Sequence, residues 1–374
     1  MKRILKWSGL ILLPIVAYLL VSPVPIEPQA WQAPRSGGYS GPYAKNQRLA
    51  SLRAISVAPE IGPEHIEFGP DGKLYTGVLS GAVLRMSPDG TGIETVVNTG
   101  GRPLGLDFDA DGNLVVADAM KGLLAVGRDG SVTVLADHVG SDPILFADAV
   151  VVASNGRILF TDASRRFSPR ELGTFDAALL DVMEHSCTGR VLEYQPPTRQ
   201  LRLVIGGLCF PNGVALSGDQ SHLFIAETGE YRVWKVDVNA EGLDARAAAR
   251  DPMHRQARVI LSNLPGFPDN LTRSADGRLW TGLTKSRPPV IDALSGKPFL
   301  RAMSLRLPRS MWPVPPAYGH VVAFDEAGRV VADLQDPSGR IPETSGVTEY
   351  DGDLYIQSLH ADALGVLPAT AIGQ

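Results

Sequence analysis

Short apolar segments alternate with tight polar turns along most of the chain. The clearest example is Phe68-Gly-Pro-Asp-Gly-Lys-Leu-Tyr-Thr-Gly, and similar segments begin at Phe108, Ala153, Leu216, Arg273 and Tyr350. Each segment predicts a strand, a tight turn and a second strand. Gly accepts the positive φ of such a turn and Asp bonds its own backbone there, while the residues that follow are rich in Leu, Tyr, Trp, Phe and Val. The pattern therefore predicts a repeated β-hairpin.

Weaker hairpin signals lie between these copies, for example at residues 86–90 and 127–130. Each repeat then holds about four strands, and six repeats of four strands are typical of a β-propeller. We expect an all-β, six-bladed propeller over residues 51–374. The stretch from Ala54 to Val57 is placed to close the ring by adding a strand to the last blade.

The copies are unevenly spaced, and the extra residues predict two insertions, at Ser164–Glu184 and Thr284–Tyr318. The second contains apolar residues that do not fall on one clean helical face. It predicts a short apolar helix or lid that covers the channel mouth or touches a bilayer. A surface loop packed on its own blade explains the pattern equally well.

The N-terminus differs from the rest of the chain. Lys2, Arg3 and Lys6 precede an apolar run from Trp7 to Val21, which is the pattern of an export signal. We expect an uncleaved signal-anchor helix over residues 1–26, with its basic end in the cytoplasm; a cleaved signal peptide is the alternative, and it would make the protein secreted. Residues 27–50, rich in Pro, Gly and Ser, predict a linker. Either way the propeller would lie on the non-cytoplasmic side.

The repeat also predicts where chemistry belongs, because the innermost strands of a propeller line one axis. The residues seven positions before each turn Asp or Asn should share one ring: Glu64, Leu104, Asp148, Asn212, Asp269 and Thr344. Four of these six carry a carboxylate or amide oxygen, and a fifth such residue, Asn270, adjoins Asp269. Taken singly, each is explained by strand capping or an Asx turn. Their shared register favours a metal site.

Three carboxylates held together repel one another and resist burial, and a hard cation removes that difficulty. Ca²⁺ takes about 6–8 oxygen ligands. We therefore predict one ion, Ca²⁺ or another divalent cation, held by Glu64, Asp148, Asn212, Asp269 and Asn270. No set of His or Cys residues matches this register, which disfavours Zn²⁺.

The net charge and the absence of two catalytic motifs argue against other classes of function. The net charge of −5 leaves no basic footprint for nucleic acid, and neither Gly-x-Ser-x-Gly nor His-Glu-x-x-His occurs. His65 is better explained as a satisfied strand histidine, and His360 is placed to reach the same end of the channel. Cys187 and Cys209 would face each other at the open end of a hairpin centred on residue 198, either as a disulfide or as two buried thiols.

Several segments resemble a known superfamily. They are Gly62-Pro-Glu-His-Ile-Glu-Phe, Gly101-Arg-Pro-Leu-Gly-Leu, Phe160-Thr-Asp-Ala-Ser, Phe210-Pro-Asn-Gly-Val-Ala-Leu-Ser and Phe267-Pro-Asp-Asn. Together they look like the strictosidine synthase-like proteins, which belong with the gluconolactonase (senescence marker) and paraoxonase families. The resemblance covers about residues 55–368. It implies a six-bladed propeller and, in the hydrolase branches, a channel Ca²⁺ and the cleavage of lactones or esters.

The resemblance also implies which residues form the site, and it shows where this chain departs from the family's pattern. The family's ligand positions match the five residues named above, with Asp148 where an Asn is usual. Ser345 stands where strictosidine synthase has its catalytic Glu, which disfavours that condensation. Leu104 replaces a paraoxonase His. His65 and Ala149 replace the carboxylates of a second, structural Ca²⁺, so one ion is expected.

Two functions remain open from the sequence. The first is a calcium-dependent hydrolase of a small-molecule lactone or ester, in which Asp269 is the first candidate for activating water and Asp148 the second. The second is a non-catalytic propeller with a structural metal, whose blade faces or 284–318 insertion bind a partner or the membrane. Fold alone does not decide between them.

Overall fold

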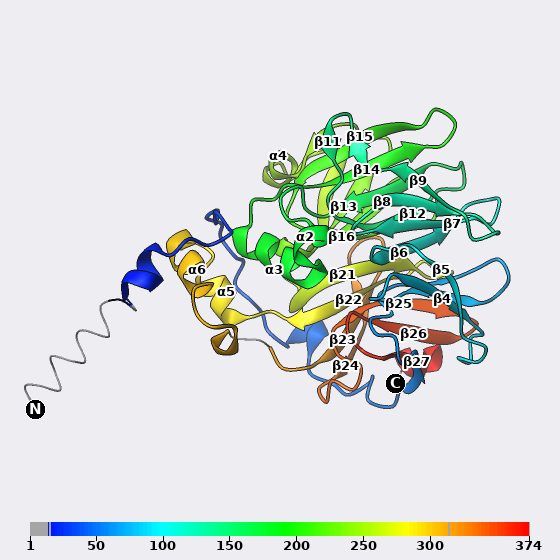
Figure 1. Cartoon of the computed structure of the whole chain (residues 1–374). Helices are drawn as coiled ribbons and strands as arrows, with labels where there is room; N and C mark the ends of the chain where they lie inside the picture. The colour runs from blue at the N-terminus through cyan, green and yellow to red at the C-terminus, as the bar shows by residue number, and fades with distance from the viewer. Residues whose placement is uncertain (1–13, 15, 313–314, 374) are drawn as a thin grey trace, which may run out of the picture.

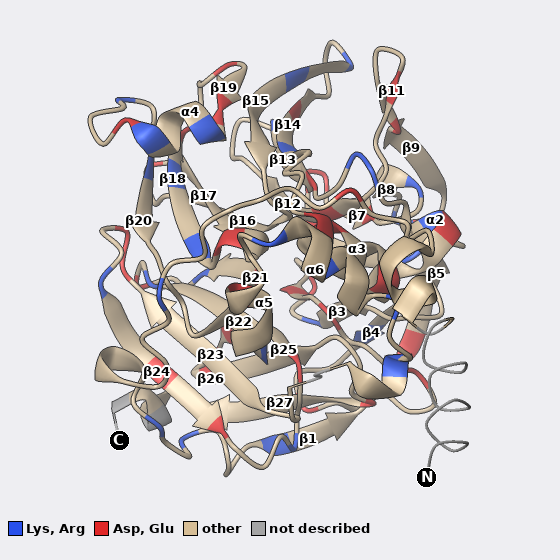
Figure 2. Ribbon diagram, turned by 90° about the vertical axis from the view of Figure 1, so that its left-hand side faces the viewer, with Lys and Arg blue, Asp and Glu red and all other residues tan. Residues whose placement is uncertain are grey.

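The structure is a computed structural model, and it describes residues 14, 16–312 and 315–373. Six antiparallel sheets surround one axis, as Figures 1 and 2 show. The innermost strands contact their neighbours around the ring. They are β2 (Ile66–Phe68), β6 (Pro103–Phe108), β12 (Ala147–Val152), β16 (Pro211–Leu216), β21 (Gly266–Arg273) and β25 (Thr344–Tyr350). The predicted all-β, six-bladed propeller is confirmed.

The remaining strands follow outward in each blade. The second strands are β3 (Leu74–Gly77), β7 (Leu114–Asp118), β13 (Ile158–Asp162), β17 (His222–Glu227), β22 (Leu279–Ser286) and β26 (Asp353–Ser358). The third strands are β4 (Ala82–Met86), β8 (Gly122–Val126), β14 (Gly189–Gln195), β18 (Arg232–Asp237), β23 (Gly319–Phe324) and β27 (Ala363–Pro368). The outer strands are β5 (Glu94–Asn98), β9 (Val132–Ala136), β15 (Gln200–Leu208), β20 (Ala257–Leu261), β24 (Val330–Asp336) and β1 (Arg53–Ser56).

The six predicted turns join each inner strand to the second strand of its blade. Apolar side chains from adjacent blades pack into shared clusters, with Trp234 and Trp280 fully buried. Short additions complete the blades: β19 (Leu243–Asp244) joins the third sheet, α4 (Ala245–Arg250) follows it, and β10 (His138–Val139) pairs with β11 (Asp142–Pro143).

The ring closes through the N-terminal strand. β1 pairs with β27 in antiparallel register, from Arg53 opposite Val366 to Ser56 opposite Ala363. The last blade therefore combines strands from both ends of the propeller, as predicted for Ala54–Val57. Ile55 of β1 is buried among the apolar residues of the first and last blades.

Both predicted insertions contain helices, and these lie over one end of the channel (Figure 2). The first insertion forms α2 (Pro169–Leu172) and α3 (Thr174–Glu184), and the second forms α5 (Pro289–Ala293), α6 (Pro298–Ser304) and η3 (Arg309–Met311). We call α3, α5 and α6 the lid. The lid interpretation of the second insertion is therefore correct. The other 3₁₀ helices are η1 (Gly41–Tyr43), η2 (Thr228–Glu230) and η4 (Ala369–Gly373).

The segment before the propeller lies against the lid (Figure 1). The Gln29 N–H donates to the Glu184 carbonyl at 2.7 Å, and the Trp31 N–H donates to the Ser295 carbonyl at 3.2 Å. The Trp31 ring also stacks on His185, with ring centroids 4.1 Å apart. These contacts fasten the first part of the segment predicted as a linker to both insertions.

Much of the predicted signal anchor, residues 1–13 and 15, lies outside the described residues. Within the described part of the chain, no helix combines the length and the apolar character that a bilayer crossing requires.

Candidate functional site

The candidate ligand residues lie at irregular positions of the inner strands. In five blades the pairing between the first and second strands shifts by one residue. The shifts lie between Pro103 and Gly105, Ala147 and Val150, Pro211 and Val214, Pro268 and Leu271, and Thr344 and Val347. Such β-bulges re-aim side chains and are common next to functional sites. Asp148, Asn212, Asp269 and Asn270 fall inside three of these bulges, and Glu64 lies two residues before β2. For the three blades that supply Asp148, Asn212 and the pair Asp269 and Asn270, the register predicted from the repeat is therefore a shared bulge.

All five predicted ligand residues are buried, and each carries one side-chain oxygen with no hydrogen-bond partner among the described residues. These atoms are Glu64 Oε2 and the Oδ1 atoms of Asp148, Asn212, Asp269 and Asn270. Buried polar atoms are normally bonded, and an unpaired one costs roughly 1–3 kcal/mol. Five unpaired oxygens and no unpaired donor within this set are what a hard cation would satisfy.

Hydrogen bonds hold several of these residues in place. The Asn270 Nδ2 donates to the backbone carbonyl and to Oε1 of Glu64, both at 2.9 Å, which leaves Asn270 Oδ1 free. Ser345 Oγ donates to the same Glu64 carbonyl at 2.5 Å. Thr161 Oγ1 donates to the Asn212 carbonyl at 3.0 Å. Hydrogen bonds from neighbouring strands thus fix Glu64, Asn212 and Asn270. We call the five candidate ligand residues the axial ring.

The three carboxylates of this set have raised pKa values, as expected for acidic groups buried close together without a cation. Burial raises the pKa of Glu64 to about 7, although Arg102 and Asn270 oppose the rise. Burial, followed by the charge of Glu64, raises the pKa values of Asp148 and Asp269 well above their usual range. A bound cation would reverse these shifts by favouring the ionised carboxylates.

Arg102 is a residue that the register argument missed. It is buried beside the ring, its Nη2 donates to the Gly62 carbonyl at 3.0 Å, and its charge acts on Glu64 and Asp148. One guanidinium only partly offsets three carboxylates. The two ring positions without acidic or amide groups stay outside the set: Leu104 is buried and apolar, and Thr344 Oγ1 bonds the backbone of His320.

A cavity of about 250 Å³ lies between this ring and the lid. Asn212 and Asp269 line it together with Phe210, Phe267 and Thr228. Its other walls are mostly apolar residues of the two insertions: Phe175, Ala178, Leu179, Val182, Met183, Val290, Ile291, Leu294, Leu305, Leu307 and Trp312. The arrangement places two polar ligand candidates at one side of a largely apolar chamber, as in many small-molecule sites.

One polar network stands at the edge of this cavity. Glu343 forms ion pairs with Lys285 and with His360, and both Lys285 and Glu343 line the cavity. Burial would raise the pKa of Glu343, but hydrogen bonds from His360 and Lys285 lower it to about 2. His360 therefore reaches the lid end of the channel, as the sequence suggested.

His65 differs from the satisfied strand histidine that the sequence favoured. It is 5% exposed, and both ring nitrogens lack a partner among the described residues. Burial lowers its pKa to about 4. It lines a second cavity, of about 520 Å³, together with Glu67 and Asp107. The expectation failed because His65, which immediately precedes β2, lines this cavity and finds no hydrogen-bond partner on the neighbouring described strands.

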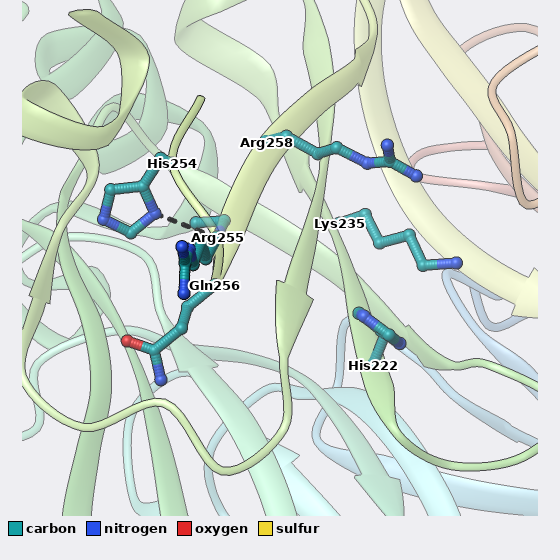
Figure 3. Close-up of a pocket in the computed structure, with 7 residues that line it drawn as sticks. His222, Lys235, His254, Arg255, Gln256 and Arg258 are labelled. Atoms are coloured by element: carbon teal, nitrogen blue, oxygen red, sulfur yellow. Dashed lines mark hydrogen bonds between the residues drawn. The ribbon is translucent and has the colours of Figure 1, made fainter. Parts of the chain in front are cut away.

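A third cavity, of about 220 Å³, lies on outer strands of the fourth blade and is lined by His222, Lys235, His254, Arg255 and Arg258, among others (Figure 3). His254 Nδ1 accepts the Ala257 N–H at 3.1 Å. This cavity contains no acidic residue and does not meet the axis.

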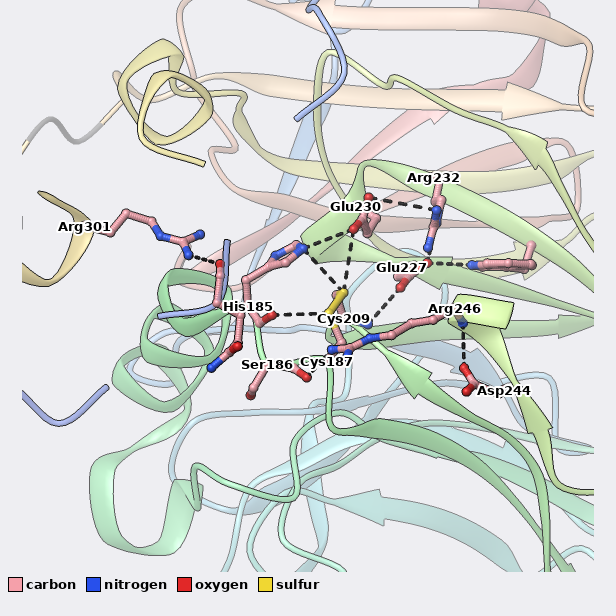
Figure 4. The surroundings of a disulfide bond; sticks show 12 residues. His185, Ser186, Cys187, Cys209, Glu227, Glu230, Arg232, Asp244, Arg246 and Arg301 are labelled. Carbon is pink, nitrogen blue, oxygen red and sulfur yellow. Dashed lines mark hydrogen bonds and ion pairs between the residues drawn. A yellow bond between two sulfur atoms is a disulfide. The ribbon is translucent and has the colours of Figure 1, made fainter. Parts of the chain in front are cut away.

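Cys187 and Cys209 are joined in a disulfide at the open end of the β14–β15 hairpin (Figure 4). His185 adjoins it, and its Nε2 lies 3.1 Å from Glu230 Oε1. Among the described residues, this is the one group of three His, Cys, Asp or Glu whose ligand atoms all lie within 4.8 Å of one another. Because the sulfurs are bonded to each other, they are not thiolate ligands. The axial carboxylates are more widely spread, and Asn212 and Asn270 complete their ring.

Comparisons with known proteins agree with this architecture. A family model described as strictosidine synthase-like, N-terminal, matches residues 41–86, and a strictosidine synthase model matches residues 148–241. Strictosidine synthase-like protein 13 of Arabidopsis thaliana is 35% identical over 81% of this chain and 79% of its own length. The adipocyte plasma membrane-associated protein of Homo sapiens is 30% identical over 96% of this chain and 88% of its own length.

Two solved structures share the fold at low sequence identity. A gluconolactonase of Xanthomonas campestris superposes with a TM-score of 0.60 at 18% identity, covering 86% of this chain and 90% of its own. The calcium-binding protein regucalcin of Agrobacterium tumefaciens gives 0.55 at 12% identity, covering 85% and 94%.

Proposed function

This chain belongs to the strictosidine synthase-like family, and we propose that it is a metal-dependent hydrolase of esters or lactones with Ca²⁺ as its ion. The observation that carries the proposal is the ring of five buried, unpaired oxygens beside an apolar cavity. The likeness of the fold to a gluconolactonase and to a calcium-binding regucalcin supports it.

The residues present fit such an ion. Glu64, Asp148, Asn212, Asp269 and Asn270 would hold it, each through the oxygen that has no partner among the described residues. When bound, the ion would act as a Lewis acid that polarises the substrate carbonyl and stabilises the developing oxyanion.

Asp269 is our first candidate for the group that takes the proton from the attacking water, since it belongs to the ring and also lines the cavity. Asp148 is the second candidate; it belongs to the ring but is not among the cavity-lining residues. His360 is a further acid–base group: Glu343 holds its Nδ1, which leaves Nε2 available for proton transfer.

The test measures hydrolysis of aryl esters and γ- and δ-lactones with Ca²⁺ and with a chelator. We expect activity that disappears on chelation and returns with Ca²⁺, together with a higher melting temperature in Ca²⁺, because a ligand of the native state stabilises it. Asp269→Asn and Asn212→Ala should each lower kcat by about 100-fold or more.

The matched control is Asp111→Asn, at the exposed turn of the second blade, which should leave kcat and the calcium response unchanged. Unchanged activity in both ring variants would refute the assignment. Stabilisation by Ca²⁺ without turnover of any ester or lactone would instead support a non-catalytic propeller with a structural metal.

Condensation of strictosidine synthase type is disfavoured, since Ser345 is a buried hydroxyl bonded to the Glu64 carbonyl.

We also propose that residues 1–26 anchor the protein in a membrane, with the propeller on the non-cytoplasmic side. The Cys187–Cys209 disulfide supports this, because disulfides persist in oxidising compartments. Separation of membranes from soluble extract, with protease protection of the propeller, tests it; recovery of the uncleaved chain in the cytosol would contradict it.

A further inference from the structure

Arg301 is a buried cation without a matching anion. It lies on α6, its side chain is 0% exposed, and it lines the cavity beside the ring. Its Nη2 donates to the Gln29 backbone carbonyl, an interaction drawn in Figure 4. Its Nε and Nη1, which carry three N–H groups between them, have no partner among the described residues.

The other charged groups of the cavity do not neutralise Arg301. Lys285 and Glu343 pair with each other, and Glu343 also pairs with His360. Asp269 belongs to the axial ring. Within the described residues no Asp or Glu forms an ion pair with Arg301, and burial alone lowers its pKa. A guanidinium stays protonated in proteins, so this one keeps an uncompensated charge beside apolar walls.

A buried charge without a partner costs several kcal/mol, and truncating one partner of a buried pair is strongly destabilising for that reason. A ligand in the cavity that supplies the anion would explain why Arg301 stands there. Carboxylates suit a guanidinium, because their planar oxygens accept several of its N–H groups. A phosphate dianion carries more charge and needs more donors than this cavity offers through one arginine.

We propose that the cavity binds amphipathic esters or lactones that carry a free carboxylate, with the carboxylate on Arg301, the apolar body between α3 and α5, and the scissile carbonyl beside Asn212 and Asp269. This inference rests on the proposed hydrolase function and specifies its substrate class. In the reaction, water adds to the acyl carbon, the bond from that carbon to the alkoxy oxygen breaks, and the leaving oxygen takes a proton. An ester gives the free acid and the alcohol, and a lactone gives one hydroxy acid.

The experiment compares mono-4-nitrophenyl esters of dicarboxylic acids, from succinate to sebacate, with 4-nitrophenyl esters of uncharged acids of equal length. We expect the charged ester of the best length to have a KM about 10-fold or more below that of its neutral counterpart, since only the charged ester can accept charge-assisted hydrogen bonds from the guanidinium. Arg301→Met should remove this preference by raising the KM for the charged ester while leaving the neutral ester within about twofold. Arg301→Lys should keep part of it.

Arg306→Met is the matched control. Arg306 follows α6 and, like Arg301, donates to backbone carbonyls, in its case those of Ser22 and Leu19, but it does not line the cavity. The Arg306→Met variant should preserve the preference for charged esters. If Arg301→Met does not fold, the comparison of charged with neutral esters on the native protein and on Arg301→Lys decides.

Calorimetry with the half-amide of the best dicarboxylic acid separates this inference from the hydrolase proposal. Binding of the half-amide that Arg301→Lys weakens, without hydrolysis of any ester, would refute the hydrolase and retain the anion site. Hydrolysis of neutral and charged esters with equal KM would refute the anion site and retain the hydrolase.

Discussion

Arg102 occupies a position that phenylalanine holds in the next three blades. Phe146, Phe210 and Phe267 each stand two residues before a ring position, and Arg102 stands two residues before Leu104. The second blade therefore contributes no oxygen to the ring but contributes a cation beside it. Aligning the repeats would have exposed this exchange, since the segment Gly101-Arg-Pro is visible in the sequence. Its electrostatic role was not visible, because that depends on distances across the axis.

A second buried charge belongs to the lid and predicts a pH dependence. Asp181 of α3 is buried, and burial raises its pKa to about 7 against a hydrogen bond from Ser164. The unfolded chain loses this proton near pH 3.9, so between about pH 4 and 7 the folded state holds more protons and its stability falls as pH rises. Above pH 7 the cost is constant, and below pH 4 it vanishes.

Asp181→Asn should therefore be more stable than the native protein by an amount that grows from pH 4 to 7 and then levels off. The plateau is at most about 4 kcal/mol, since each tenfold change in proton affinity corresponds to about 1.4 kcal/mol. Urea denaturation of both proteins from pH 4 to 8 measures the difference. A difference that is constant over this range would contradict the burial argument.

At the scale of elements, the bulges of the inner strands require close approach between blades. A Cβ on Gly213, which follows Asn212 in the β16 bulge, would lie 2.1 Å from the Leu271 backbone nitrogen of the next blade. The neighbouring atoms are backbone and cannot rotate away. The sequence predicted which residues share the register, but the bulges that turn them inward follow from pairing between strands.

Gly213→Ala should destabilise the protein by about 1–3 kcal/mol, the usual cost of overpacking, and should weaken calcium binding by displacing Asn212. Gly206→Ala on β15 is the control, since its Cβ would meet nothing closer than 3.9 Å. Denaturation midpoints with and without Ca²⁺ measure both effects. Equal calcium responses in the two variants would show that the bulge does not position Asn212.

At the scale of the whole molecule, the propeller closes on itself through one shared blade. β1 supplies the outer strand of the blade that β25–β27 begin, so both ends of the propeller meet in one sheet. An unpaired β27 would present an open strand edge, which favours aggregation.

Ile55→Ala should therefore cost about 2–4 kcal/mol, because it opens a cavity between the first and last blades. Ser56→Ala, at the exposed neighbouring position of β1, should change stability by less than about 0.5 kcal/mol. Thermal unfolding followed by light scattering measures both stability and aggregation. Equal melting temperatures in the two variants would show that closure does not depend on this contact.

The sequence alone determined the blade number, the ring closure and the axial register of Glu64, Asp148, Asn212, Asp269 and Asn270. Repetition made this possible, since one local pattern of turn and strand recurs and symmetry carries equivalent residues to one place. Tertiary structure alone decided the rest. The lid cavity combines the insertion helices with residues of the inner strands. The charged network joins Lys285 of the second insertion to Glu343 and His360, which flank strands of the last blade. Arg301, which forms no ion pair among the described residues, belongs to the second insertion. Their side chains meet only after blades distant in the chain are packed together, and no local periodicity encodes those distances.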